Sequence, residues 1–307
     1  MLMGIYQQIQ KNKRNTILLF GGFIFLIVAV VYTIALFLDP GAAYIFAAIA
    51  LVVTFIGSFF SYYHSDKILL KMSDARPVSK EMEPHLYHTI EGVAIAAGIP
   101  TPKAYVIETD VPNAFATGRN PENSAVAVTR GLMKVLNREE MEGVVAHEMA
   151  HIKNYDILFT TLAIVFTGML VFMGRALSRM FFTGARRGGG GGRGGAGQLV
   201  ILLVVGIVTA VIAPLAAKAA QMAISRNREY LADATAANML GYPLGLASAL
   251  EKLDRHSNPA KAAQDGFANE ANAGLFIVNP LAKNINAESF FSTHPSINKR
   301  VERLRNM

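Results

Sequence analysis

The chain has 307 residues, of which 52% are hydrophobic and 17% are charged, and its net charge is +7. Such an apolar composition is not that of an ordinary soluble enzyme, and it predicts membrane-spanning segments. The sequence has no cysteine, which excludes disulfide bonds, thiolate metal sites and cysteine nucleophiles. Excess Lys and Arg in membrane proteins usually faces the cytoplasm and anionic lipid, and no basic stretch is interleaved with aromatic residues. We therefore expect a lipid bilayer, and no nucleic acid, as a partner.

Two apolar runs near the N-terminus, residues 16–38 and 42–63, are each long enough to cross a bilayer. Lys and Arg flank the outer ends of both runs, whereas the turn at residues 39–41 carries no basic residue. This pattern predicts a transmembrane hairpin over residues 1–63, with the N-terminus and the following domain in the cytoplasm. A cleaved signal peptide fits less well, because the first run is longer than a signal core and no A-x-A-like site follows it.

The next part of the chain, residues 64–156, mixes polar and apolar residues and indicates a domain outside the membrane. Hydrophobic periodicity and turn signals predict a helix at 81–97, strands at 103–108, 113–117 and 124–129, and a helix that begins near residue 137. The start of this last helix carries a capping box. The side chain of Asn137 can accept from the first turn, and Glu140 follows three residues later.

Two further apolar runs, residues 157–173 and 199–217, are joined by a glycine-rich segment at 184–197 that reads as a flexible linker. If both runs cross the membrane, the arginines between them lie outside the cytoplasm, against the usual tendency. Full crossing and a partly buried or re-entrant hairpin therefore both remain open for residues 157–217. Residues 218–307 are again more polar and contain a predicted helix at 224–240 and a terminal basic helix.

A motif for metal chemistry lies in the helix that follows Asn137. His147 and His151 are four residues apart, so both imidazoles lie on one helix face and can bind one ion. Glu148 stands beside them as a base that can take a proton from water and pass it to a leaving amine, while zinc polarises the carbonyl. H-E-x-x-H on a helix is typical of zinc metalloproteases. The alternative, a helix with two incidental histidines, is weakened by the capping box and the apolar face of the helix.

Two histidines leave a zinc ion short of a third protein ligand. Glu229 and Asp233 are also four residues apart, on the predicted helix at 224–240. One of them can bind the ion while the other orients a ligand histidine through a hydrogen bond. A solvated acidic pair between arginines explains the same spacing equally well.

The sequence resembles the HtpX family of membrane proteases, which belongs to the same broad group as the CAAX prenyl endoprotease. The shared features are a basic N-terminus, a two-span hairpin, H-E-x-x-H, two more hydrophobic runs, S-R-x-x-E-[YF]-x-A-D and a terminal H-P-S. The resemblance implies one Zn²⁺ per chain, bound by His147, His151 and Glu229. It also implies that Glu148 is the catalytic base and that Asp233 supports a ligand histidine.

The resemblance also implies a fold and a set of residues that meet the substrate. The fold is a mainly α membrane protein of α+β type, with four hydrophobic helices and a gluzincin-like zinc peptidase domain that contains a small β-sheet. Asn113 and Ala114 resemble an edge strand to which a peptide adds. His294 and Arg300 resemble donors to the substrate carbonyl and oxyanion. The alternatives are that the segment with Asn113 and Ala114 is an ordinary strand with a buried Phe, that His294 is a surface residue, and that Arg300 caps a helix. Asp156 matches a common family position.

These observations predict a membrane-bound zinc metalloendopeptidase of the plasma membrane of a bacterial-type cell, whose catalytic domain is cytoplasmic. The expected substrates are membrane or membrane-proximal proteins, misfolded ones above all, in quality control or a stress response. We expect residues 64–156 and 218–307 to form two parts of one peptidase domain. An inactive scaffold or transporter-like protein is the alternative, although the runs lack the polar residues that transport needs. A prenyl-protein endoprotease is a further alternative, for which four hydrophobic runs are few.

Overall fold

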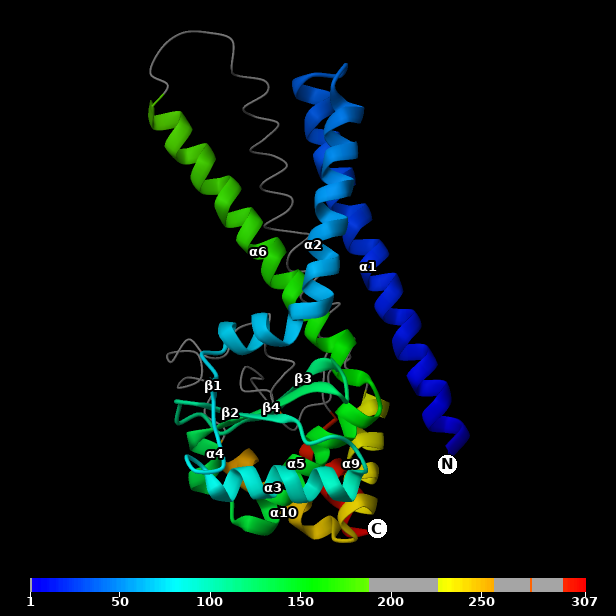
Figure 1. Cartoon of the computed structure of the whole chain (residues 1–307), viewed down its shortest axis with the longest axis vertical. Coiled ribbons are helices and arrows are strands. Elements are labelled where there is room, and N and C mark those ends of the chain that lie inside the picture. The colour runs from blue at the N-terminus through cyan, green and yellow to red at the C-terminus, as the bar shows by residue number, and fades with distance from the viewer. Residues whose placement is uncertain (1, 188–225, 257–276, 278–294) are drawn as a thin grey trace.

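The computed structural model describes residues 2–187, 226–256, 277 and 295–307, and it has long helices above a mixed α/β domain (Figure 1). The helices are α1 (Leu2–Leu38), α2 (Ala43–Met72), α3 (Pro84–Ala97), α4 (Arg130–Val135), α5 (Arg138–Lys153), α6 (Asp156–Arg187), α9 (Arg226–Leu240), α10 (Pro243–His256) and α12 (Ile297–Arg305). The strands are β1 (Arg76–Pro77), β2 (Lys103–Ile107), β3 (Ala114–Asn120) and β4 (Asn123–Thr129). The described fold is therefore mostly helical with one small sheet.

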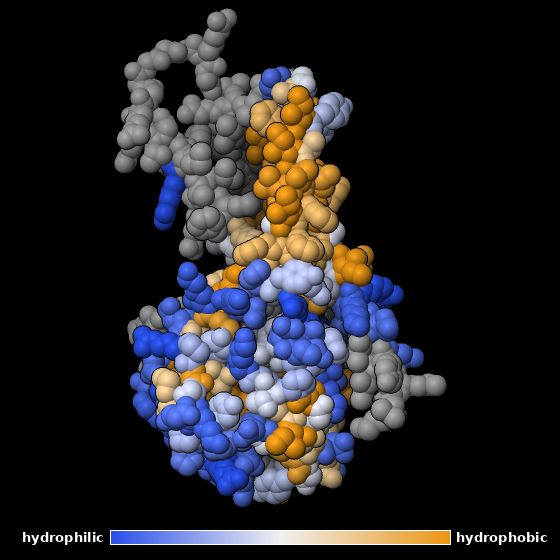
Figure 2. Space-filling model, viewed as in Figure 1, coloured by the Kyte–Doolittle hydropathy of each residue, from blue (hydrophilic) through white to orange (hydrophobic). Residues whose placement is uncertain are grey.

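The predicted hairpin consists of α1 and α2, which contain segments long and apolar enough to span a membrane, Gln10–Leu36 and Ala43–Met72. The turn between them is held by the carboxylate of Asp39, which accepts from the backbone of Gly41 and Ala42. Figure 2 shows apolar residues gathered on these upper helices and hydrophilic residues on the domain below. Large apolar side chains exposed in this way are stable in lipid and not in water.

Both hairpin helices extend further than the sequence predicted. Helix α1 begins at Leu2 and not near residue 16, and α2 continues to Met72 and not to residue 63. Neither extension contains a proline, so nothing interrupts the helical hydrogen bonds. The extension of α2 reaches the sheet, where Leu69 and Leu70 pack in one buried cluster with Phe115.

The sheet is mixed, with strand order β1-β2-β4-β3. Strands β2 and β4 are parallel, whereas β1 pairs antiparallel with β2 and β3 pairs antiparallel with β4. Alternate residues point to opposite faces. Phe115 packs with α2 and with Ile164 of α6, whereas Ala114 and Ala116 pack with α3 and α5. The sheet thus lies between the apolar helices and α5, and β3 is its edge on the side of the histidine motif.

Helix α5 has the predicted capping box. The side chain of Asn137 accepts from the backbone of Glu140 at 2.9 Å, and the side chain of Glu140 accepts from the backbone of Asn137 at 2.8 Å. The buried carboxylate of Glu140 also accepts from Ser248 and Lys252 of α10, at 2.6 and 2.7 Å. These bonds fix α10 against α5, and α9 packs along the same helix.

Some predicted features lie outside the described residues: the run at 199–217, most of the glycine-rich segment and His294. The run at 157–173 lies in the first part of α6, whose apolar stretch Asp156–Leu170 is shorter than the two apolar segments of the hairpin. The predicted terminal basic helix is α12, which begins at Ile297. The division into domains stays a prediction.

Candidate metal centre and active site

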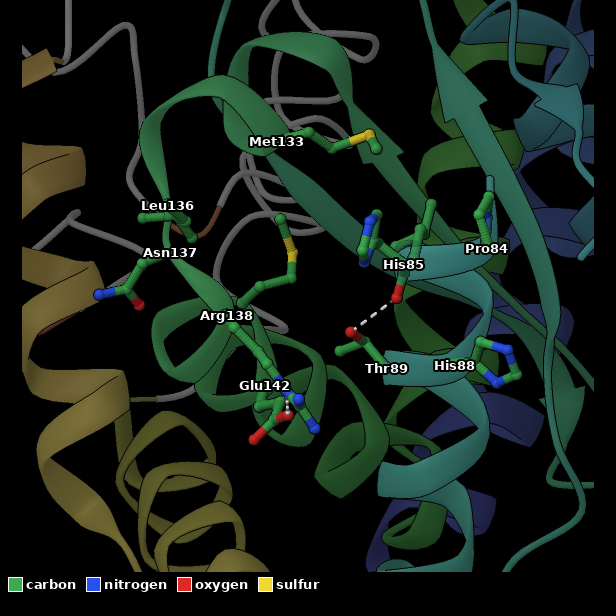
Figure 3. A pocket seen from close by; sticks show the side chains of 11 residues that line it. Pro84, His85, His88, Thr89, Met133, Leu136, Asn137, Arg138 and Glu142 are labelled. Atoms are coloured by element: carbon green, nitrogen blue, oxygen red, sulfur yellow. Dashed lines mark hydrogen bonds and ion pairs between the residues drawn. The ribbon is translucent and has the colours of Figure 1, made fainter. Parts of the chain in front are cut away.

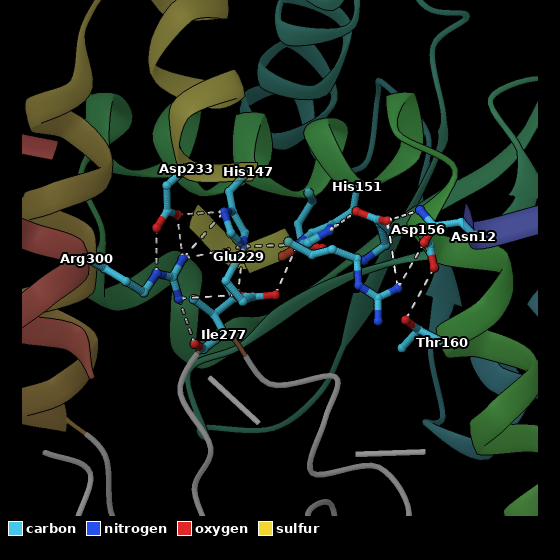
Figure 4. A network of polar contacts seen from close by, with 12 residues as sticks. Asn12, His147, His151, Asp156, Thr160, Glu229, Asp233, Ile277 and Arg300 are labelled. Atoms are coloured by element: carbon cyan, nitrogen blue, oxygen red, sulfur yellow. Dashed lines mark hydrogen bonds and ion pairs between the residues drawn. The ribbon is translucent and has the colours of Figure 1, made fainter. Parts of the chain in front are cut away.

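Three potential metal ligands meet between α5 and α9. His147 and His151 project from one face of α5, and their Nε2 atoms are 3.3 Å apart. One carboxylate oxygen of Glu229, from α9, lies 3.6 Å from His147 Nε2, and the other lies 3.5 Å from His151 Nε2. Among the described residues, this is the group of three whose donor atoms come within metal-binding distance of one another (Figure 4).

The separations of these donors suit a tetrahedral ion. Nitrogen and oxygen ligands lie about 2.0–2.2 Å from zinc, so two ligands of one tetrahedral ion are about 3.4 Å apart. The two Nε2 atoms are 3.3 Å apart, and each lies 3.5 or 3.6 Å from a different oxygen of Glu229, so these nearest donor–donor distances are close to that value. Imidazole nitrogen and carboxylate oxygen are also the donor types that zinc takes when no thiolate is present.

A carboxylate orients each histidine ring from behind. Asp233 Oδ1 is 3.0 Å from His147 Nδ1, and Asp156 Oδ2 is 3.2 Å from His151 Nδ1. When Nδ1 donates its proton to a carboxylate, Nε2 is left as a lone-pair donor toward the common point. The sequence suggested this arrangement for Asp233, whereas it identified Asp156 only as a family position.

The charges around the cluster favour a divalent cation. Four carboxylates are buried here, on Glu148, Asp156, Glu229 and Asp233, whereas the buried guanidinium groups are two, on Arg228 and Arg300. With neutral imidazoles, the described residues place two more buried carboxylates than guanidinium groups here, and such an excess of negative charge is costly in a buried site.

The pKa of His147 reflects the same excess of negative charge. Burial lowers this pKa, but the hydrogen bonds that the Asp233 and Glu229 carboxylates accept outweigh burial and raise the pKa to about 9. The surrounding carboxylates thus stabilise positive charge on His147. The donor types, their separations and the charge balance all fit a metal ion.

Glu148 is held between α5 and the edge strand. It is buried, and its Oε2 accepts from the backbone N–H of Ala116 on β3 at 2.8 Å. Burial raises the pKa of its carboxyl above the ordinary value, whereas the positive charge of a bound ion acts in the opposite direction. A carboxylate with a raised pKa next to a metal site can accept a proton near neutral pH.

Of the residues predicted to meet substrate, Asn113, Ala114 and Arg300 lie around the same site, whereas His294 is outside the described residues. Ala114 is buried in β3 opposite Val128. Asn113 is also buried. Its Oδ1 accepts from the backbone N–H of Ile277 at 3.2 Å, and its Nδ2 has no hydrogen-bond partner among the described residues.

Arg300 is fully buried in this region, and its guanidinium donates to both oxygens of Asp233, at 2.7 and 2.8 Å. Another of its nitrogens donates to the carbonyl of Ile277 at 3.4 Å. The structure therefore gives Arg300 a supporting position behind Asp233, and its contact with substrate stays a prediction.

A separate cleft of about 500 Å³ opens beside the first turn of α5, between α3 and α4 (Figure 3). His85, His88 and Glu142 stand on its polar rim, and Met133 and Leu136 line its apolar part. His88 pairs with its helical neighbour Glu91 at 3.2 Å. Within the described chain, these histidines do not form part of a three-ligand group.

Residues 80–307 match the model of the family described as Peptidase family M48. The chain belongs to this family. It is 42% identical over 302 residues to a Protease HtpX homolog of Dictyoglomus turgidum, covering 98% of this chain and 94% of the relative. It is 45% identical over 256 residues to one of Thermococcus sibiricus, covering 83% and 85%. It is 39% identical over 303 residues to one of Streptococcus gordonii, covering 99% and 100%.

Among solved structures, the crystal structure of S. mikatae Ste24p is similar at 17% identity with a TM-score of 0.47. That match covers 92% of this chain and 62% of Ste24p, so this chain spans less than two thirds of that protein. The resemblance to the HtpX family is confirmed by the full-length relatives. The family, the two apolar helices and the ligand cluster together identify a membrane metalloprotease.

Proposed function

We propose that this chain is a zinc-dependent endopeptidase that cleaves membrane or membrane-proximal proteins. The observation that supports it most is the meeting of His147, His151 and Glu229 beside a buried Glu148 that an edge strand holds in place. In this proposal the first three bind one Zn²⁺ and Glu148 is the catalytic base. Asp233 and Asp156 keep the two histidine rings in position.

The roles of zinc and Glu148 in the reaction follow from the chemistry of each group. Zinc, when bound, polarises the scissile carbonyl and lowers the pKa of the attacking water. Glu148 takes the proton from that water and gives it to the leaving nitrogen. The N–H of Ala116 fixes the Glu148 carboxylate, so the acceptor oxygen does not have to be reoriented during the reaction.

We propose that the peptide substrate adds to β3 as a further strand. The carbonyl of Asn113 accepts a hydrogen bond from the backbone N–H of Thr129 on β4. Because backbone groups of an antiparallel edge strand point alternately toward and away from the neighbouring strand, those of Ala114 and Ala116 point away from β4. The Ala116 N–H bonds to Glu148 on that side. A peptide along this edge would pass the base directly. The further assignment of His294 and Arg300 as donors to substrate rests on the family resemblance.

The position of the site supports membrane-proximal substrates. Thr117 of β3 and Thr161 of α6 are in hydrogen-bond contact, at 3.1 Å between hydroxyl oxygens, and both are buried. The edge strand therefore touches the start of an apolar helix one residue beyond the contact of Ala116 with Glu148. We propose that the substrates are misfolded membrane proteins, cleaved in quality control or a stress response.

Removal of the metal tests the reaction. We expect the detergent-purified protein to carry about one zinc per chain and to cleave a casein-type substrate. Dialysis against a chelator should remove both the zinc and the cleavage, and stoichiometric Zn²⁺ should restore cleavage. Metal-bound protein that is folded but cleaves nothing would favour the inactive scaffold.

The edge strand is tested by Ala114→Pro. Proline removes the outward N–H, which a bound peptide would use, and it is tolerated on edge strands. We expect turnover to fall at least about tenfold, since one backbone hydrogen bond contributes on the order of 1 kcal/mol and the ring also obstructs the edge. Ala114→Gly, which keeps the N–H, is the matched control. Both variants should remain folded and keep their zinc, and a normal turnover by Ala114→Pro would remove β3 from the substrate site.

Topology is tested with single cysteines, because the chain has no cysteine of its own. We propose that the peptidase domain is cytoplasmic. Ser79→Cys and Glu302→Cys, both exposed in the domain, should resist an impermeant thiol reagent in intact cells. Gly41→Cys, in the exposed turn between α1 and α2, should be labelled and serves as the control. Labelling of residue 79 or 302 from outside would reverse the orientation.

A further inference from the structure

A polar residue of the hairpin is buried against the metal centre. Asn12 lies on α1, most of whose described side chains are exposed or half-buried, yet it is only 2% exposed. Its Nδ2 donates to Asp156 Oδ1 and to the carbonyl of Asn154, and its Oδ1 accepts from Arg228 Nη1 at 3.4 Å. Asn12 therefore joins three segments that are far apart in sequence: α1, the turn between α5 and α6, and α9 (Figure 4).

The amide is the group that this position requires. Arg228 and Asp156 are 3.9 Å apart, which leaves their direct ion pair long and weak. The amide stands between them, with its carbonyl toward the guanidinium and its NH₂ toward the carboxylate. A rotated amide, or an aspartate, would place an oxygen against Asp156, and an alkyl side chain would leave buried charges without a partner.

The second oxygen of Asp156 leads to the metal centre. While Oδ1 accepts from Asn12, Oδ2 faces Nδ1 of His151 at 3.2 Å. The other ligand histidine has the same arrangement, because Asp233 faces His147 and is itself held by Arg300 from α12. Asn12 thus holds the carboxylate behind His151, as Arg300 holds the carboxylate behind His147.

Neighbouring contacts keep α1 and the turn together. The Nζ of Lys13 lies 5.3 Å from the ring centre of Tyr155. Tyr155 has a φ of 58°, in the left-handed region that non-glycine residues rarely adopt. A turn of this conformation is held by its surroundings, and α1 supplies part of them.

We propose that Asn12 is a positioning residue for the metal: by fixing Asp156 it fixes the ring of His151, so the N-terminal membrane helix is part of the metal-binding apparatus. The inference rests on the proposed metal site, and Asn12 itself contacts neither ion nor substrate. It means that a displacement of α1 in the membrane changes metal affinity in the domain below.

The test is metal affinity of the full-length protein in detergent, measured with Co²⁺ in competition with a chelator and followed by the visible spectrum of the bound cobalt. Asn12→Leu is nearly isosteric and removes all three side-chain hydrogen bonds. We expect it to raise the Kd about tenfold and to change the spectrum, since partners behind metal ligands typically contribute 10–100-fold. Thr16→Val, a buried position one turn along α1, is the matched control and should bind cobalt like the wild type.

A double-mutant cycle shows whether the effect passes through Asp156. In an Asp156→Ala background, Asn12→Leu should have little further effect on the Kd. An unchanged Kd in the single variant, or an equal loss in both backgrounds, overturns the inference. Thermal unfolding checks the fold, and Asn12→Ala replaces Asn12→Leu if the latter unfolds. If the wild type binds cobalt but cleaves nothing, the proposed function fails while this inference stands; if it binds no cobalt, both fail.

Discussion

Replacing Glu148 with Gln is expected to abolish cleavage and to leave the bound zinc in place. The amide keeps the shape of the side chain, and its oxygen can still accept the hydrogen bond that Ala116 donates. It cannot accept a proton from water, however, and general-base catalysis contributes about 100- to 10,000-fold. We therefore expect kcat to fall by at least about 100-fold, with little change in KM.

Three measurements on the same preparation distinguish this outcome from misfolding: zinc per chain after dialysis, initial rates on a casein-type substrate, and thermal unfolding. Glu139→Gln, an exposed glutamate in the first turn of the same helix, is the matched control and should behave like the wild type. Cleavage by Glu148→Gln at the wild-type rate would contradict the proposed mechanism. Loss of zinc from this variant would instead place Glu148 among the ligands.

Local patterns predicted much of this fold. The capping box of Asn137 and Glu140, the alternation in β2 and β4, and the apolar runs that became α1 and α2 are all properties of neighbouring residues. The i, i+4 spacing also placed His147 and His151 on one helix face. Such features depend on backbone periodicity, which a sequence displays directly.

The contacts that complete the site are long-range and were not predictable in the same way. Asn12 and Arg228 are 216 positions apart and meet only because α1 extends beyond the apolar run and reaches the turn after α5. From the sequence alone, Asn12 lies among basic residues just before a membrane span, and such a residue is expected to be exposed to solvent. Arg300 was predicted from the family resemblance as a donor to substrate, whereas its surroundings could be known only once α12 was placed beside α9.

Ala116 was missed for a related reason. A backbone N–H carries no sequence signal, and its bond to Glu148 depends on how β3 passes α5. A strand at 113–117 was predicted, but its place at an edge was implied only by the family resemblance. Among the described strands, β3 pairs with β4 alone, which makes it the edge. The sequence thus predicted the reactive and metal-binding residues better than the long-range contacts that keep those residues in position.

The complementary variant is Glu229→Gln, which is expected to lose zinc affinity together with activity. The neutral amide is a poor ligand for zinc compared with a carboxylate, and it removes one of the buried negative charges that the cation balances. We expect the Kd for zinc to rise by more than about 100-fold, beyond the 10–100-fold that is typical of residues behind the ligands. Excess zinc should restore part of the turnover, whereas the same excess should do nothing for Glu148→Gln.

Zinc content after dialysis and the rate of proteolysis at increasing zinc concentration measure this effect, with the exposed Glu122→Gln as the control. Asp233→Asn provides a graded comparison, because it leaves the three donors intact and disturbs only the hydrogen bond to His147 Nδ1. Its loss of affinity should be smaller than that of Glu229→Gln. If Glu229→Gln holds zinc as tightly as the wild type while Asp233→Asn does not, Asp233 is the third ligand and the His147 ring must turn to present its other nitrogen.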